Sequence, residues 1–262
     1  MPQREVSILN RQFRVVSFYL KREVVLDAVL YTADNRNSEL PVIFMNDGQD
    51  IEALGLSKSL NDFSLKNERS FLCVAIHSSQ ERLQEYGVAG YPDYANRGSK
   101  ASNYSNFILK ELIPYLKLHF SIKNNGHSIF GFSLGGLSAF DLTIEHQNVF
   151  TKVGVFSGAF WWRSRDLGPA YSDEHDRIMH QKLKRSSIKS ELGCWFQCGT
   201  LDEKTDRNKN GIIDSIDDTM DIISILKKKG VENVVYREVV NGKHNHETWK
   251  KVIPEFLLWL GQ

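Results

Sequence analysis

The stretch Gly131-Phe132-Ser133-Leu134-Gly135-Gly136 holds a serine with a glycine two residues away on either side. The apolar residues 127–130 precede it, and residues 137–144 are compatible with a helix. Strand, sharp turn and helix in this order are the context of a nucleophile elbow, in which the turn exposes the serine oxygen. The backbone is strained at such a turn, and glycines leave room for the neighbouring strand and helix. We therefore predict that Ser133 is a nucleophile.

A nucleophilic serine needs a base, and the base needs a carboxylate that orients it. Residues 192–198 are apolar and predict a buried strand, which runs into Asp202 and Glu203. An acid at the carboxyl end of such a strand lies on the side of a parallel sheet where ligands bind. The sequence therefore offers Asp202 as the orienting acid, with the adjacent Glu203 as the alternative.

The base follows the acid along the chain. Residues 234–240 alternate like a strand and lead to His244, and residues 249–260 carry an apolar stripe that predicts a final helix. Serine, acid and histidine is the chain order of serine hydrolases built on an α/β sheet. His244 is therefore the predicted base, and His246, two residues further on, is the alternative.

Six stretches of the chain together resemble the esterases of the α/β-hydrolase superfamily, the group that contains enterochelin esterase, S-formylglutathione hydrolase, some feruloyl esterases and the mycolyltransferases. The stretches are residues 45–50, 82–86, 111–115, 131–136, 199–202 and 242–244, the last with Trp249. They span most of the chain beyond residue 40, and they are more specific to the superfamily than to any one substrate.

The resemblance implies an α/β-hydrolase fold with Ser133 as nucleophile, Asp202 as acid and His244 as base. It also implies an oxyanion hole formed by the backbone amides of Leu134 and Gln49. The position of these amides agrees with that role, because one follows the nucleophile at a helix N-terminus and the other lies in a turn after an early strand.

The order of the predicted elements agrees with this fold class. Residues 14–20 and 24–31 read as antiparallel opening strands, and residues 41–45 and 71–76 as buried parallel strands. Residues 99–120 fit a helix interrupted near Pro114, and strands alternate with helices to the end. This order predicts a mostly parallel sheet covered by helices on both faces, in a single domain over residues 1–262.

Residues 206–217 form an insertion that fits the calcium-loop template D-x-[DN]-x-[DN]-G-x5-E, with Asp217 in the last place, and the loop leads into a helix predicted over residues 217–229. Calcium prefers six to eight oxygen ligands. The template takes them from the side chains of Asp206, Asn208, Asn210, Asp214 and Asp217 and from the carbonyl of Ile212. Because aspartate has a shorter arm than glutamate, weaker binding is expected. We predict a structural calcium ion that orders the segment holding Asp202; a polar loop that binds nothing is the alternative.

Composition sets the remaining limits. The 262 residues are 41% hydrophobic and 25% charged, which indicates one large core. Thirty-three Lys and Arg against 32 Asp and Glu give a net charge of +1, so no nucleic-acid partner is indicated. Three cysteines in apolar stretches indicate reduced thiols. No apolar leader or membrane-length run is present, which predicts a cytoplasmic protein without a membrane partner. The sequence carries no prediction of oligomeric state.

The sequence says less about the substrate. Trp161 and Trp162 follow a strand that ends near residue 156, and we predict that they wall a cleft for an acyl or aryl group. Their alternative is a place in the core, because tryptophan is usually mostly buried. The polar residues 163–190 predict a cap-like excursion with a helix over residues 173–183.

These observations predict a serine esterase that acts on a small-molecule ester through an acyl-enzyme. A siderophore lactone, a feruloyl or acetyl ester and a small-metabolite ester all fit. Two alternatives stay open: an acyltransferase of the same fold, in which an alcohol replaces water, and a catalytically silent, calcium-dependent binding module. Fold by itself does not distinguish among them.

Overall fold

The strands form one mostly parallel sheet in a computed structural model, which describes residues 7–32, 39–67 and 70–262. Within these residues the sheet has eight strands in the order β1-β2-β4-β3-β5-β6-β7-β8. Their bounds are β1 Ser7–Ser17, β2 Arg22–Thr32, β3 Val42–Asn46, β4 Phe71–Ile76, β5 His127–Phe132, β6 Phe150–Phe156, β7 Gly193–Leu201 and β8 Val234–Lys243.

The first two strands are antiparallel, as the sequence predicts. β1 and β2 pair from Ser7 with Thr32 to Ser17 with Arg22, and β2 runs antiparallel to β4. From β4 onward, every neighbouring pair is parallel. All residues of β3, β4 and β5 are buried, which agrees with their mostly apolar sequences. The predicted α/β-hydrolase fold class is confirmed.

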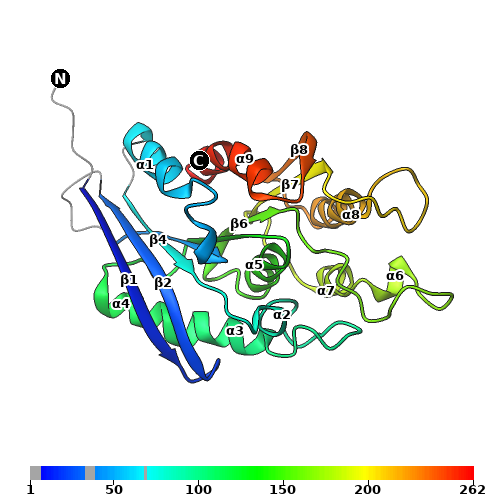
Figure 1. Cartoon of the computed structure of the whole chain (residues 1–262), viewed down its shortest axis with the longest axis horizontal. Coiled ribbons are helices and arrows are strands. Elements are labelled where there is room, and N and C mark those ends of the chain that lie inside the picture. The colour runs from blue at the N-terminus through cyan, green and yellow to red at the C-terminus, as the bar shows by residue number, and fades with distance from the viewer. Residues whose placement is uncertain (1–6, 33–38, 68–69) are drawn as a thin grey trace.

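Helices cover both faces of the sheet (Figure 1). On one face α1 and α9 lie side by side, and on the other lie α3, α4, α5, α7 and α8, each face with its own apolar core. The helices are η1 Gly48–Asp50, α1 Leu56–Asn67, α2 Arg82–Glu85, α3 Ala101–Phe107, η2 Ile108–Leu112, α4 Ile113–His119, α5 Leu134–Glu145, α6 Asp173–Asp176, α7 Ile178–Arg185, α8 Asp214–Lys228 and α9 His246–Leu260.

Three predicted helices differ in detail from those observed. The helix predicted over residues 99–120 is observed as α3, η2 and α4, which follow one another without a gap. The irregularity expected near Pro114 is the wider π-helical turn of η2, which directly precedes the turn that holds the proline ring. The segment 173–183 is split at Arg177, whose backbone is extended. The helix expected from residue 217 already begins at Asp214.

Other features of the chain fit the composition. Cys73, Cys194 and Cys198 are buried free thiols, as their apolar surroundings predict. None of the helices in the described part of the chain combines the length and the apolar composition that a membrane span needs.

The parallel strands bring polar residues to one edge of the sheet. Their carboxyl ends lie at the same edge, so the segments that follow β3, β5, β6, β7 and β8 meet there. Those segments carry Gln49, Ser133, Ser157, Asp202 and His244.

Candidate active site

Ser133 occupies a strained turn between β5 and α5. Its φ is 53° and its ψ is −122°, a backbone conformation that residues other than glycine rarely adopt. The amide of Ser133 donates to the carbonyl of Phe156 at 2.8 Å, which fixes the turn against β6. A Cβ at Gly131 would lie 2.4 Å from the carbonyl oxygen of Gly135, so only glycine fits there. The motif therefore specifies a backbone geometry that places the serine in a tight turn at the carboxyl end of β5.

Two backbone N–H groups lie in turns beside this serine. Leu134 is the first residue of α5, so its N–H has no acceptor within the helix. Gln49 lies in η1, which follows β3 through Asp47 at φ 60°. The side-chain amide of Asn46 donates to the carbonyl of Gly135 at 2.7 Å and joins the two turns. These turns are where the sequence predicts the oxyanion donors.

Asp47 and Arg82 support the turn that carries Gln49. Two hydrogen bonds of 2.7 Å join the Arg82 guanidinium to the Asp47 carboxylate, which is 4% exposed. The amide of Asp47 donates to the Tyr86 hydroxyl at 3.1 Å. Sequence reasoning placed these residues in family-like stretches but gave them no role. Their occurrence in two separate stretches of the resemblance was the available signal.

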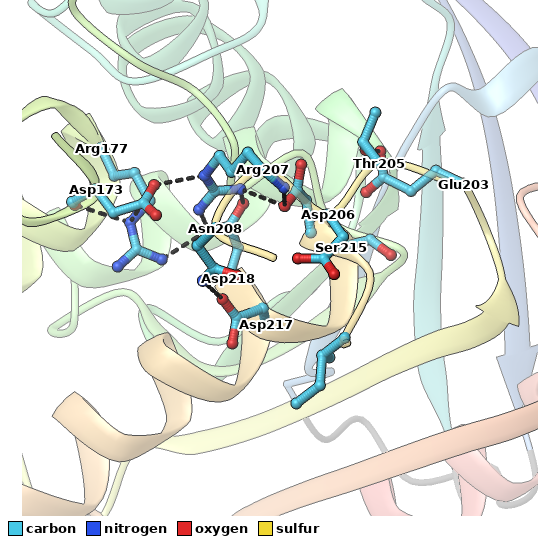
Figure 2. Close-up of polar contacts among 12 residues, drawn as sticks. Asp173, Arg177, Glu203, Thr205, Asp206, Arg207, Asn208, Ser215, Asp217 and Asp218 are labelled. Atoms are coloured by element: carbon cyan, nitrogen blue, oxygen red, sulfur yellow. Dashed lines mark hydrogen bonds and ion pairs between the residues drawn. The ribbon is translucent and has the colours of Figure 1, made fainter. Parts of the chain in front are cut away.

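Asp202 directly follows the carboxyl end of β7. Its Oδ2 accepts a hydrogen bond of 3.0 Å from the amide of Gly199, and its Oδ1 is buried without an aligned donor among the described residues. Burial raises the pKa of Asp202, while that amide, the Ser157 hydroxyl and His244 oppose the rise. Glu203 instead accepts from the Thr205 hydroxyl in its own loop (Figure 2). Asp202 is thus the carboxylate that turns inward.

His244 lies between β8 and α9. Its ring packs edge-on against Trp249, with centroids 5.3 Å apart, while part of the residue stays exposed. Loss of solvation lowers the pKa of His244 from 6.5, Asp202 and Glu203 oppose this, and Arg82 adds to it. A histidine with a lowered pKa is neutral at pH 7 and able to accept a proton.

His246, the alternative base, lies elsewhere. Its Nε2 is 3.4 Å from Oδ2 of Asp50, and it is the first residue of α9. Asp202 raises the pKa of His244, which favours the first of the two histidines as the predicted base.

Comparison with known proteins identifies the family. Residues 20–260 match the family described as "Putative esterase". The chain belongs to this family. It is therefore a carboxylic ester hydrolase, and the resemblance seen in the sequence is confirmed.

Relatives of this esterase agree in sequence and in fold. An uncharacterized protein of Bacillus subtilis (strain 168), YjcH, is 24% identical over 218 residues, which cover 81% of this chain and 80% of the relative. The enterobactin esterase FES from Shigella flexneri in the presence of enterobactin has a TM-score of 0.75 at 19% identity, over 99% of this chain and 60% of that one. A ferulic acid esterase has a TM-score of 0.72 at 14% identity, over 98% of both chains.

The two tryptophans of the esterase lie in different surroundings. Trp162 has no exposed surface, and its indole N–H donates to the carbonyl of Tyr91 at 3.1 Å. A side chain without exposed surface does not contact a substrate, so Trp162 is a core residue and its assignment to a cleft wall is corrected. Trp161 is partly exposed, and the guanidinium of Arg97 lies 5.0 Å from its ring. Trp161 remains the candidate for substrate contact.

The calcium-loop residues turn partly toward one another. The carboxylate of Asp206 accepts from the amides of Asn210 at 3.1 Å and Gly211 at 2.9 Å. The side-chain amide of Asn208 donates to Asp217 at 2.8 Å (Figure 2). Ile212, whose carbonyl oxygen the template uses as a ligand, is exposed. Four of the template ligand positions are thus joined in two pairs, Asp206 with Asn210 and Asn208 with Asp217.

Asp214, the remaining template residue, points to a different partner. It accepts from the amide of Arg207 at 2.9 Å and lies 3.2 Å from Nη1 of the same arginine. Within residues 7–32, 39–67 and 70–262, no cluster of three His, Cys, Asp or Glu is arranged to hold a metal. Calcium binding by this loop stays a prediction.

Arg207 is the centre of a buried ion network (Figure 2). Its guanidinium contacts Asp173 of α6 and both oxygens of Asp218 of α8, which is 1% exposed. Arg177 also donates to Asp218, at 2.7 Å. The network therefore joins the excursion over residues 163–190 to α8, the helix that follows the loop after Asp202.

Proposed function

We propose that this esterase cleaves its substrate through Ser133, His244 and Asp202, with an acyl-enzyme on Ser133. The observation that supports this most is the strained turn of Ser133, at the end of the sheet where Asp202 and His244 also follow parallel strands. Strain of this kind persists where the surrounding structure maintains it, and it concentrates at functional sites.

The proposed reaction begins with proton transfer. Neutral His244 takes the proton of the Ser133 hydroxyl as its oxygen attacks the ester carbonyl carbon. The N–H groups of Leu134 and Gln49 stabilise the negative charge that develops on the carbonyl oxygen. Asp202 fixes the tautomer of His244 and stabilises the imidazolium.

The second half of the reaction restores the enzyme. The imidazolium of His244 gives its proton to the leaving alcohol as the tetrahedral intermediate collapses to the acyl-enzyme. Water then loses a proton to His244 and attacks the acyl carbon, and the Ser133 oxygen leaves with that proton.

The proposed substrate is a small-molecule ester. Structures with the same fold include an enterobactin esterase and a ferulic acid esterase, so a siderophore lactone and a feruloyl or acetyl ester are the classes to test, along with small-metabolite esters. Partly exposed Trp161 supports an acyl or aryl group that packs on its ring.

The test uses p-nitrophenyl acetate and an aryl ester such as methyl ferulate. Ser133→Ala should lower kcat by about 10⁶-fold. Ser105→Ala, on α3, is the matched control and should leave kcat unchanged. In the wild type, mass spectrometry of a quenched reaction should find the acyl group on Ser133. Retained activity in Ser133→Ala would refute the proposal.

Product analysis separates hydrolysis from acyl transfer. With methanol present as an acceptor, a hydrolase gives mainly the free acid, because water attacks the acyl-enzyme. A methyl ester formed far beyond the share set by the methanol concentration would instead establish the esterase as an acyltransferase.

A further inference from the structure

Ser157 is a strained residue at the end of β6 that the proposed mechanism does not yet use. Its φ is 47°, a backbone value that residues other than glycine rarely adopt, and the residue is 1% exposed. Glycine relieves such strain and stands at the next position, Gly158. A serine retained in this conformation indicates that its side chain has a use.

Its backbone and hydroxyl are both anchored. The amide of Ser157 donates to the carbonyl of Gln197 on β7 at 2.7 Å. The indole N–H of Trp249 donates to Oγ of Ser157 at 2.9 Å. A hydroxyl has a single proton, and since Oγ here accepts from Trp249, that proton remains available to a further acceptor.

The available acceptor is Asp202. Ser157 and Asp202 follow the neighbouring strands β6 and β7, and the Ser157 hydroxyl lowers the pKa of that carboxyl. Oδ2 already accepts from the amide of Gly199, and Oδ1 is buried with no aligned donor among the described residues. A buried carboxylate oxygen without a donor is costly, and the Ser157 hydroxyl has a proton to donate.

The same arrangement touches the base. Trp249, which fixes the Ser157 oxygen, packs edge-on against His244 with ring centroids 5.3 Å apart. Ser157 therefore bonds to Trp249, which packs against the base, and it follows the strand next to the one that leads to the acid.

We propose that Ser157 is a positioning residue of the esterase reaction, whose hydroxyl, held by Trp249, keeps the Asp202 carboxylate turned toward His244. This inference rests on the proposed function, in which Asp202 orients His244. Ser157 does not touch the reacting atoms, so its loss lowers kcat and leaves KM for p-nitrophenyl acetate nearly unchanged. We expect a decrease in kcat of about tenfold for Ser157→Ala, small beside the loss of a triad member.

The test is a double-mutant cycle of Ser157→Ala and Asp202→Ala with p-nitrophenyl acetate. If Ser157 acts through Asp202, its replacement costs about tenfold in the wild-type background and less than twofold when Asp202 is already alanine. Equal losses in both backgrounds would overturn the inference, because they indicate a general structural role. An undiminished kcat in Asp202→Ala alone would instead refute the proposed acid.

Ser157→Gly guards against a folding defect. Glycine removes the strain at φ 47°, so this variant should melt at or above the wild-type temperature while its kcat falls as in Ser157→Ala. A stably folded Ser157→Gly with wild-type kcat would overturn the inference.

Discussion

The turn at Ser133 and the loop 206–217 both match a known sequence motif, yet they differ in how closely the structure follows the motif. At Ser133 each glycine and the strained serine have the geometry that the motif requires. In the loop, Asp214 bonds to Arg207, a residue that the calcium template does not specify.

The difference lies in what each motif encodes. The nucleophile elbow encodes backbone geometry, because a Cβ at Gly131 would collide with the helix behind it. The calcium template encodes a set of oxygen donors, and carboxylates accept from arginine as readily as they bind a cation. A backbone motif therefore predicts structure more strongly than a list of ligands does.

The largest expected effect separates the two histidines at the catalytic edge. His244→Ala should lower kcat by about 10⁴-fold or more, since no other group there takes the serine proton. His246→Ala, the matched control, loses the contact with Asp50 and an edge-on ring contact with Trp249, and it should stay within threefold of wild type. Steady-state hydrolysis of p-nitrophenyl acetate measures both. Equal losses would erase the distinction between the two positions.

The next effect concerns stability at the loop. Arg207→Met leaves the buried carboxylate of Asp218 with one fewer cation, and we expect a loss of about 3 kcal/mol in the free energy of unfolding. Arg14→Met removes an exposed pair with Glu23 and should cost less than about 0.5 kcal/mol. Urea denaturation measures both. A loss of stability for Arg207→Met no larger than that for Arg14→Met would show that the network is not a stabilising element.

Much of the fold followed from the sequence, because apolar runs and their order carry it. The opening antiparallel pair, the parallel strands and the order of Ser133, Asp202 and His244 are all local patterns placed along one chain. The sequence predicted the irregularity near Pro114 and the start of the helix at Asp214 less accurately. The π-helical turn and the contact of Asp214 with Arg207 both depend on packing against other parts of the structure.

The remaining site residues depend on contacts between distant segments. Ser157, Asp47 and Arg82 have hydrogen-bond partners 35 or more positions away, and no local pattern reports such pairs. Trp162 was misplaced for the same reason, because its burial is set by the loop that carries Tyr91.

A smaller effect should appear in the pH dependence at the catalytic edge. Burial lowers the pKa of His244 below 6.5, Asp202 and Glu203 oppose this, and Arg82 adds to it. Wild-type kcat/KM should therefore fall only as pH drops below about 6.5, where the imidazolium forms. Arg82→Gln removes the lowering charge, so its acidic limb should move to higher pH. Arg22→Gln, which loses a pair with Glu85, is the control. An Arg82→Gln limb that stays in place or moves to lower pH would contradict this account of His244.

The smallest expected effect is that of calcium on the loop. Calcium at ten times its dissociation constant adds about 1.4 kcal/mol to the stability of a protein that binds it only when folded. We expect calcium to raise the melting temperature of the wild type and of Lys209→Ala but not of Asp206→Ala. A chelator should lower activity and melting temperature together. Identical melting curves in calcium and in chelator would leave the loop as an arginine-bound turn.

The proposed mechanism depends most on Ser133 as an activated nucleophile. Treatment of the folded protein with a fluorophosphonate, followed by peptide mass spectrometry, tests this directly. We predict one adduct, on Ser133, that forms far more slowly in His244→Ala. An adduct on another serine, or none on a protein shown to be folded, would contradict the central claim.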